Sequence, residues 1–261
     1  MRAFACALAA SLLAAPGGAD ARGGAASLNL CTDELLLLLA APAQVASVTY
    51  LSQDPLESPL WRSAQRYRGN DGSLLSIAAK APALVIDMGG GGRDTPEIAR
   101  RLGIRTLLLP YPQTLGDVER SIAAVARALG RTEQGRVLIG RIEQLRLTSP
   151  ARPADTIWLG GGGESLAPDG LGAQWMRLAG LRQRPLAANR VTLEGLALHR
   201  PAILLRSDYR GGQYSSQQRW LSHPLVARGG WKTVRTDGRR WTCMGPMMIG
   251  EIARLRRETE R

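Results

Sequence analysis

One stretch decides how this chain is organised: Thr114-Leu-Gly-Asp-Val-Glu-Arg-Ser-Ile122, which continues to Glu143-Gln-Leu-Arg-Leu147. Thr114 is positioned to cap the start of a helix, and Gly130 is positioned to end it. Between them, apolar residues recur in steps of three and four, which places them on one helical face. These apolar residues are Leu115, Val118, Ile122, Val125 and Leu129.

A second helical run follows after a short break, with apolar residues at Val137, Ile142 and Leu145 and a stop at Pro150. Alternating strand and helix patterns lie on both sides of this helical pair. We interpret the pair as a spine that joins two Rossmann-like α/β lobes, with a ligand cleft between the lobes. The alternative is one more crossover helix within a single α/β sheet.

The expected strands and helices alternate along the chain, as in parallel α/β folds. The expected strands are 26–30, 45–50, 83–88, 105–109, 155–159, 202–206 and 231–236. The expected helices besides the spine are 33–40, 74–80, 96–103, 173–179, 193–198, 217–221 and 246–257.

A local repeat favours two lobes over one sheet. Leu74-Leu-Ser-Ile-Ala-Ala-Lys-Ala-Pro82-Ala-Leu-Val-Ile matches Leu193-Glu-Gly-Leu-Ala-Leu-His-Arg-Pro201-Ala-Ile-Leu-Leu, with helix, proline and strand in the same order. The two copies lie on either side of the spine. We therefore expect an N-terminal lobe at 22–113, a spine at 114–150 and a C-terminal lobe at 151–261.

The first 21 residues are typical of a secretory signal peptide. Arg2 precedes a short apolar run, and Ala19-Asp-Ala21 offers an A-x-A cleavage site. Later apolar runs are too short to span a bilayer. We therefore expect an exported, periplasmic protein.

The formal net charge is +12, and nearly all of the positive charge is arginine. Because the arginines are scattered rather than clustered, we interpret them as a hint towards an acidic ligand and expect no nucleic-acid partner. The two later cysteines, Cys31 and Cys243, each follow an expected strand, one in each lobe, so both should face the cleft. Two free, part-buried thiols are the simpler expectation, and a disulfide between the lobes is the alternative.

Catalytic and nucleotide motifs do not fit the sequence. The glycine loops 89–92 and 160–163 match neither G-x-G-x-x-G nor the P-loop pattern. No G-x-S-x-G is present, and neither His199 nor His223 is placed beside a nucleophile. Metal-binding cysteine pairs are also absent from the sequence, and we expect no cofactor and no protein-bound metal.

Ligands of open α/β sheets bind beyond the carboxyl ends of the strands. That rule selects residues that follow the expected strands, with aromatic side chains as walls and arginines for carboxylates. Arg210 and Arg240 belong to this arginine set. The candidate ligand-binding residues are Cys31, Tyr50, Trp61, Arg93, Arg206, Tyr209, Tyr214 and Trp241.

Several of these segments together resemble a known family. They are Ser27-Leu-Asn-Leu-Cys-Thr-Asp-Glu-Leu-Leu36, Val48-Thr-Tyr-Leu-Ser52, Ala81-Pro-Ala-Leu-Val-Ile86, Arg101-Leu-Gly-Ile-Arg-Thr106 and the second repeat. In this order they are similar to periplasmic solute-binding proteins of ABC importers, in the class with a rigid helical backbone. The resemblance extends over about residues 26–257. It implies a non-enzymatic monomer that binds a metal chelate (iron–siderophore, haem or corrinoid) and delivers it to a permease in the inner membrane.

The chain departs from the cobalamin-binding members of this family at two places. Their cleft tryptophans correspond to about Gly69 and Met88 here, so that aromatic cage is not carried over. An exported α/β enzyme such as a hydrolase, or a partner-binding module without a small ligand, is the alternative function.

The resemblance also implies a permease-docking glutamate at the start of the helix before the proline-bounded strand in each lobe. In the second lobe this position is Glu194, whose carboxylate also suits the helix dipole. In the first lobe the matching residue is Leu75, so Asp71 or Glu57 is expected to stand in.

Overall fold

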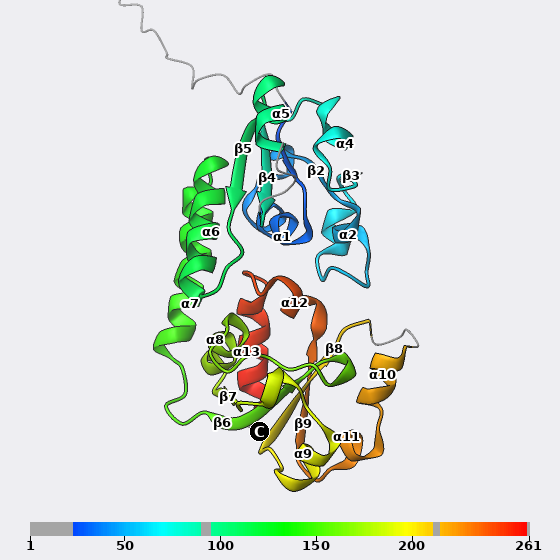
Figure 1. The fold of residues 1–261 in the computed structure, drawn as a ribbon. Coiled ribbons are helices and arrows are strands. Elements are labelled where there is room, and N and C mark those ends of the chain that lie inside the picture. The colour runs from blue at the N-terminus through cyan, green and yellow to red at the C-terminus, as the bar shows by residue number, and fades with distance from the viewer. Residues whose placement is uncertain (1–22, 90–94, 211–214, 260–261) are drawn as a thin grey trace, which may run out of the picture.

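The computed structural model describes residues 23–89, 95–210 and 215–259, in which two parallel β-sheets are connected by a pair of long helices (Figure 1). The first sheet has the strand order β3-β2-β1-β4-β5, and the second has the order β7-β6-β8-β9. Every strand pair in both sheets is parallel. The strands are β1 (Ala25–Ser27), β2 (Val45–Thr49), β3 (Arg68–Asn70), β4 (Leu84–Met88), β5 (Arg105–Leu109), β6 (Ala154–Leu159), β7 (Leu181–Gln183), β8 (Ile203–Asp208) and β9 (Lys232–Asp237).

Helices cover both sheets and connect them. They are α1 (Leu30–Leu39), α2 (Tyr50–Gln53), α3 (Trp61–Ala64), α4 (Leu74–Ala78), α5 (Thr95–Arg101), α6 (Leu115–Ala128), α7 (Thr132–Leu147), α8 (Leu171–Leu178), α9 (Leu193–Leu198), α10 (Ser216–Leu221), α11 (Pro224–Arg228), α12 (Gly238–Cys243) and α13 (Met248–Thr259). The first lobe comprises β1 to β5 with α1 to α5, and the second comprises β6 to β9 with α8 to α13.

This architecture confirms the predicted fold class. The first sheet has the strand order of a dinucleotide-binding fold, and the second has the order of a flavodoxin-like fold. The sequence repeat corresponds to α4–β4 in one lobe and α9–β8 in the other. In both sheets the repeated strand lies directly beside the first strand of its lobe, as β1·β4 and β6·β8.

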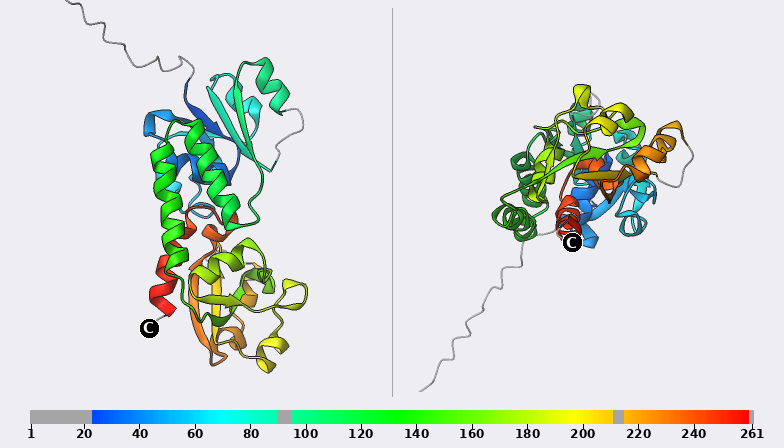
Figure 2. Two further views of the ribbon diagram at one scale, coloured as in Figure 1. Left: turned by 90° about the vertical axis from the view of Figure 1, so that its left-hand side faces the viewer. Right: turned by 90° about the horizontal axis from the view of Figure 1, so that it is seen from below.

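The predicted spine is an antiparallel helical hairpin, α6 and α7 (Figure 2). Thr114 caps α6 in a reciprocal capping box with Asp117. Gly130 follows the end of α6 with a φ of +67°, and the Arg131 N–H reaches back to the Ala126 carbonyl, which makes a Schellman ending. A side chain at Gly135 of α7 would overlap Ala126, so this glycine lets the two helices approach closely.

The apolar core is continuous between the lobes rather than divided at the cleft. One cluster of buried residues includes Leu36 of α1, Ile122 of α6, Ile142 of α7 and Trp175 of α8, and it continues to Ile252 of α13. Burying a side chain of this size contributes about 1.5–3 kcal/mol. The helical hairpin therefore joins the lobes through packing as well as through the chain.

The structure corrects two predicted elements near the cleft. The expected strand at 26–30 ends at Ser27, and Leu30 already belongs to α1, because the Asn29 side chain accepts the N–H groups of Cys31 and Thr32 and caps that helix. Asp33, expected as the first residue of this helix, is therefore a buried residue in the first turn of α1. Residues 238–243, to which no element was assigned between the last expected strand and the last expected helix, form α12, which Asp237 caps.

Several short elements were not predicted, among them β3 and β7, each at one edge of its sheet. Within the described ranges, no helix is long and apolar enough to cross a membrane.

Candidate functional site: a cleft between two lobes

The carboxyl ends of both sheets face one another, so the segments that follow the strands meet between the lobes. Figure 1 shows α1 at the lower end of the first lobe, opposite α12 at the upper end of the second. A disulfide joins Cys31 in the first turn of α1 to Cys243 at the end of α12. The expectation of two free thiols is therefore wrong, because α12 and α1 pack together and bring the two sulfur atoms into bonding contact.

Hydrogen bonds continue this junction on both sides of the disulfide. Glu34, one turn after Cys31, is buried and accepts the Met247 N–H at 2.7 Å. A side chain at Gly245 would overlap the Glu34 carboxylate, so glycine is required for this close approach. Within the second lobe, Trp175 Nε1 donates to the Met244 carbonyl at 2.8 Å and holds the residue that follows Cys243. The two lobes thus meet in a packed seam rather than across open solvent.

A cavity of about 290 Å³ lies beside the disulfide, between the lobes. The first lobe contributes Met88 and the exposed Tyr111, and the second contributes Leu166 and Met244. Cys31 and Cys243 themselves form part of its wall.

A larger cavity of about 560 Å³, which we call the arginine cavity, is lined by Arg239 and Arg240 of α12 and by residues of both lobes. Pro55 and Leu56 of the first lobe form one wall, and β8, β9, α12 and α13 of the second lobe form the rest. Five arginines and three carboxylates line it: Arg210, Arg235, Arg239, Arg240, Arg254, Asp208, Asp237 and Glu251.

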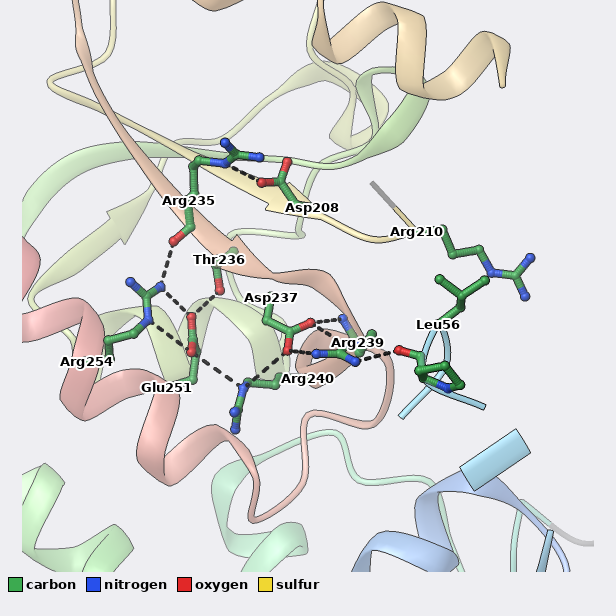
Figure 3. A pocket seen from close by; sticks show the side chains of 11 residues that line it. Leu56, Asp208, Arg210, Arg235, Thr236, Asp237, Arg239, Arg240, Glu251 and Arg254 are labelled. Carbon is green, nitrogen blue, oxygen red and sulfur yellow. Dashed lines mark hydrogen bonds and ion pairs between the residues drawn. The ribbon is translucent and has the colours of Figure 1, made fainter. Parts of the chain in front are cut away.

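The charged side chains form a chain along one wall (Figure 3). Arg254 holds Glu251 with two hydrogen bonds, from Nη2 at 2.6 Å and from Nε at 3.2 Å. Arg239 holds Asp237 in the same bidentate way, at 2.8 and 2.7 Å, and also donates to the Pro55 carbonyl of the other lobe at 2.6 Å. Thr236 supports Glu251 with a hydroxyl donation at 2.5 Å.

Arg240 differs from the other arginines on this wall. Its Nε lies 3.7 Å from Asp237 and 3.6 Å from Glu251, too far for a hydrogen bond to either carboxylate. That Nε is buried and has no hydrogen-bond partner, while Nη1 donates to the Met247 carbonyl at 3.1 Å. The buried Nε is out of reach of a ligand, but the two Nη groups carry four N–H donors and only the one hydrogen bond to Met247, so they retain donors for an anion in the cavity.

Ion pairs in the cavity favour the charged forms of Asp237, Arg239 and Arg254. Burial opposes the charge on Asp237, but hydrogen bonds from Arg239 and the field of Arg240 outweigh it and hold the pKa of this carboxyl below its usual value. Hydrogen bonds to Glu251 raise the pKa of Arg254, and hydrogen bonds to Asp237 raise that of Arg239.

Glu57 of the first lobe makes polar contacts with the second lobe. It pairs with Arg210 and accepts the Tyr209 hydroxyl, both from the second lobe, and its side chain is 7% exposed. Its burial removes Glu57 as the surface acid that was expected to stand in for Leu75. Burial, with a further contribution from Asp54, raises the pKa of Tyr209.

The structure brings some of the predicted site residues to the cleft and separates others. Cys31 lies in the seam and Tyr209 at the cleft edge. Tyr50 begins α2 and is exposed, and Trp61 begins α3, where Arg62 lies over its ring. Arg93 and Tyr214 lie outside the described residues.

Trp241 and Arg206 make their contacts within the second lobe. Trp241 is 4% exposed, packs 5.8 Å from Trp158 between ring centroids and donates to Thr236, so it is a core residue of the second lobe rather than an aromatic wall. Arg206 pairs at 2.9 Å with Asp208, which lines the arginine cavity, but Arg206 does not line the cavity itself.

Three residues of the arginine cavity were not predicted from the sequence: Arg235, Glu251 and Arg254. Exposed and buried residues alternate in the second half of β9, and Arg235 is one of the exposed ones. Glu251 and Arg254 lie three residues apart on α13. These patterns place the side chains on exposed faces, but only tertiary packing brings the two faces to one cavity. Among the described residues, no group of three or more His, Cys, Asp or Glu is arranged to hold a metal ion.

No family model and no curated protein matches this sequence, but many solved structures share the fold. The periplasmic heme-binding protein HutB of Vibrio cholerae aligns with a TM-score of 0.69 and 16% identity, over 92% of this chain and 100% of that chain. The periplasmic heme-binding protein RhuT of Roseiflexus sp. RS-1, in apo form, aligns with a TM-score of 0.66 and 18% identity, over 90% and 96%.

A third similar structure is the siderophore-binding protein BauB, bound to a complex of two acinetobactin molecules and ferric iron. It aligns with a TM-score of 0.67 and 14% identity, over 91% of this chain and 93% of that chain. The chain therefore has the two-lobed fold of the periplasmic binding proteins whose lobes are joined by a helical backbone.

Proposed function

We propose that this protein is the periplasmic substrate-binding component of an ABC importer, and that it binds an anionic metal chelate and delivers it to the permease. The fold supports a binding role, since the similar structures are named as haem- and siderophore-binding proteins. The observation that carries the proposal is the arginine cavity between the lobes. A guanidinium matches the planar, bidentate geometry of a carboxylate, and it retains donors after pairing with one acid.

The lining favours a hydrophilic, carboxylate-rich chelate over a macrocycle such as haem or a corrinoid. Pro55 and Leu56 are the apolar residues of the arginine cavity, whereas a macrocycle presents two large faces that need apolar cover. The chelate would bring its own metal ligands, and the protein would bind the outer carboxylates. Arg240, which lines the cavity and whose Nη groups make a single hydrogen bond, is the residue that we assign to the first contact.

We infer a binding rather than a catalytic role. His199 lies at the end of α9, and His223 caps α11 by accepting the Leu225 N–H. Both helices belong to the second lobe, and neither histidine lines the arginine cavity. A hydrolase that used either residue as its base would therefore have its chemistry away from the cavity.

The proposal is tested by titrating the protein with tris(oxalato)chromate(III), an inert, trianionic carboxylate chelate, and with hemin as the macrocyclic comparison. We expect saturable binding of the oxalato complex. Arg240→Gln removes a charge-assisted contact and should weaken this binding about 10- to 100-fold. Arg235→Gln should also weaken it.

Arg101→Gln is the matched control for Arg235→Gln. The Arg101 side chain is 72% exposed and pairs with Glu97, much as the 70% exposed Arg235 pairs with Asp208, but Arg101 lies on α5 away from the cleft. The control should bind as the wild type does. Tight hemin binding that is insensitive to Arg240→Gln, without oxalato binding, would overturn the choice of ligand class.

A further inference from the structure

A chain of hydrogen bonds links the arginine cavity to a buried carboxylate of the other lobe. Arg240 Nη1 donates to the Met247 carbonyl at 3.1 Å. The backbone N–H of Met247 in turn donates to Glu34 Oε1 at 2.7 Å. Met247 directly precedes α13, so Glu34 of the first lobe satisfies an N–H near the start of a helix in the second lobe. One residue thus connects the ligand-facing arginine to the seam.

The charged and the neutral form of Glu34 are close in free energy near neutral pH. Burial raises the pKa of this carboxyl to about 7, while the Met247 hydrogen bond and the field of Arg240 act in the opposite direction. The Met247 N–H and, to a smaller extent, the positive charge of Arg240 therefore stabilise its ionised form. An anion bound to Arg240 would cancel part of that field.

Other charged groups near α1 have partners of their own. The elements packed against α1 are β1, β2, β4, α2, α6 and α12. On α1 itself, Asp33 is turned to the N–H and hydroxyl of Thr49 at the end of β2. Asp87 of β4 accepts from Asn29, Asp117 of α6 pairs with Arg120, and Glu119 of α6 pairs with Arg146. Asp237 and Arg239 at α12 pair with each other, and Glu251 of α13 is held by Thr236 and Arg254.

We infer that binding of an anionic chelate at Arg240 is coupled to the uptake of one proton by Glu34 across the interlobe seam. This inference rests on the proposed function, because it requires an anion in the arginine cavity. The proton comes from solvent and converts the Glu34 carboxylate to the neutral acid, whose remaining carbonyl oxygen can still accept the Met247 N–H. No covalent bond is formed or broken, and the ligand is held only by hydrogen bonds and charge.

The coupling predicts how affinity changes with pH. Binding is stronger when Glu34 is already protonated, so affinity should fall as pH rises through neutrality. For a displacement of about one pKa unit, the dissociation constant should rise about tenfold from pH 6 to about pH 9. Near pH 7.5 the wild type should take up about half a proton per bound chelate.

The test is isothermal titration of the intact wild-type protein with tris(oxalato)chromate(III), whose oxalate ligands do not titrate near neutral pH. Measurements in phosphate and in Tris buffer, which differ in ionisation enthalpy, report the number of protons taken up. Glu34→Gln carries a neutral isostere, so it should bind at high pH as tightly as the wild type does at low pH, with no proton uptake. Glu97→Gln, an exposed change on α5, should behave as the wild type does.

The possible outcomes separate this inference from the proposed function. Absence of any oxalato binding by the wild type would refute the ligand class and the coupling together. Binding with equal heats in both buffers would leave the proposed function standing and refute the coupling. If the Glu34→Gln protein does not fold, the buffer comparison on the wild type still decides the question.

Discussion

The disulfide between Cys31 and Cys243 should contribute most of its stabilisation through the unfolded chain. The two cysteines are 212 residues apart, so the bond closes nearly the whole described chain into one loop. In the chain-entropy treatment a loop of this length lowers the entropy of the unfolded state by an amount worth about 5 kcal/mol at 25 °C. Removal of such bonds costs roughly 2–5 kcal/mol in practice. We therefore expect Cys31→Ser with Cys243→Ser to lower the free energy of unfolding by about 3–5 kcal/mol.

The assay is urea unfolding followed by tryptophan fluorescence, with the oxidised wild type, the reduced wild type and the double variant compared at one pH. The variant should retain its fold, because the apolar core that continues through α6, α7 and α8 does not depend on the bond. The midpoint should therefore fall. The slope with urea should rise somewhat, because the unlinked unfolded chain exposes more surface.

An identical midpoint for all three samples would refute this reasoning. A thiol count on the unfolded, unreduced protein provides an independent check, because two titratable thiols would exclude the bond itself.

The other predictions concern binding, motion, docking and pH. Affinity for tris(oxalato)chromate(III) should fall with added salt, because exposed charges are screened beyond about 8 Å at physiological ionic strength; an unchanged affinity in high salt would argue against charge recognition. Small-angle scattering should show little change in radius of gyration with the chelate, since a shared core and a disulfide restrain the lobes, and a large compaction would contradict this. Glu194 is exposed on α9, and Glu194→Ala should impair transport without altering chelate affinity. Leu75→Ala, at an 86% exposed position on α4, should impair transport less. Normal transport by the Glu194→Ala protein would leave stabilisation of the start of α9 as the role of Glu194. Folding raises the pKa of Glu34 from 4.5 to about 7, so between these pH values the folded protein binds more protons than the unfolded chain, and the free energy of unfolding should fall as pH rises. Urea unfolding of Glu34→Gln should show a smaller fall in this free energy over the same pH range; an equal fall in variant and wild type would reject this explanation.

Local patterns in the sequence were sufficient for the architecture. The apolar spacing of Leu115 to Leu129, with Thr114 and Gly130 at its ends, predicted α6, because a helical face and its caps are properties of residues three or four apart. The helix–proline–strand repeat predicted an α/β unit on each side of the spine for the same reason. The start of α1 was misplaced because Leu28 and Leu30 look strand-like, whereas the Asn29 side chain decides the conformation there.

The site depended on contacts between residues distant in sequence. From the sequence, Cys31 and Cys243 could be two free thiols or a disulfide. They form the disulfide because α12 packs on α1 and brings the two sulfur atoms together. It offered Trp241 as a cleft wall, but α12 turns this side chain into the core, where the apolar ring is removed from water. Composition indicated an anionic ligand through its many arginines, yet it could not show which of them meet. Arg235, Arg240 and Arg254 share one cavity because β9, α12 and α13 pack together, and no pattern within a single element encodes that meeting.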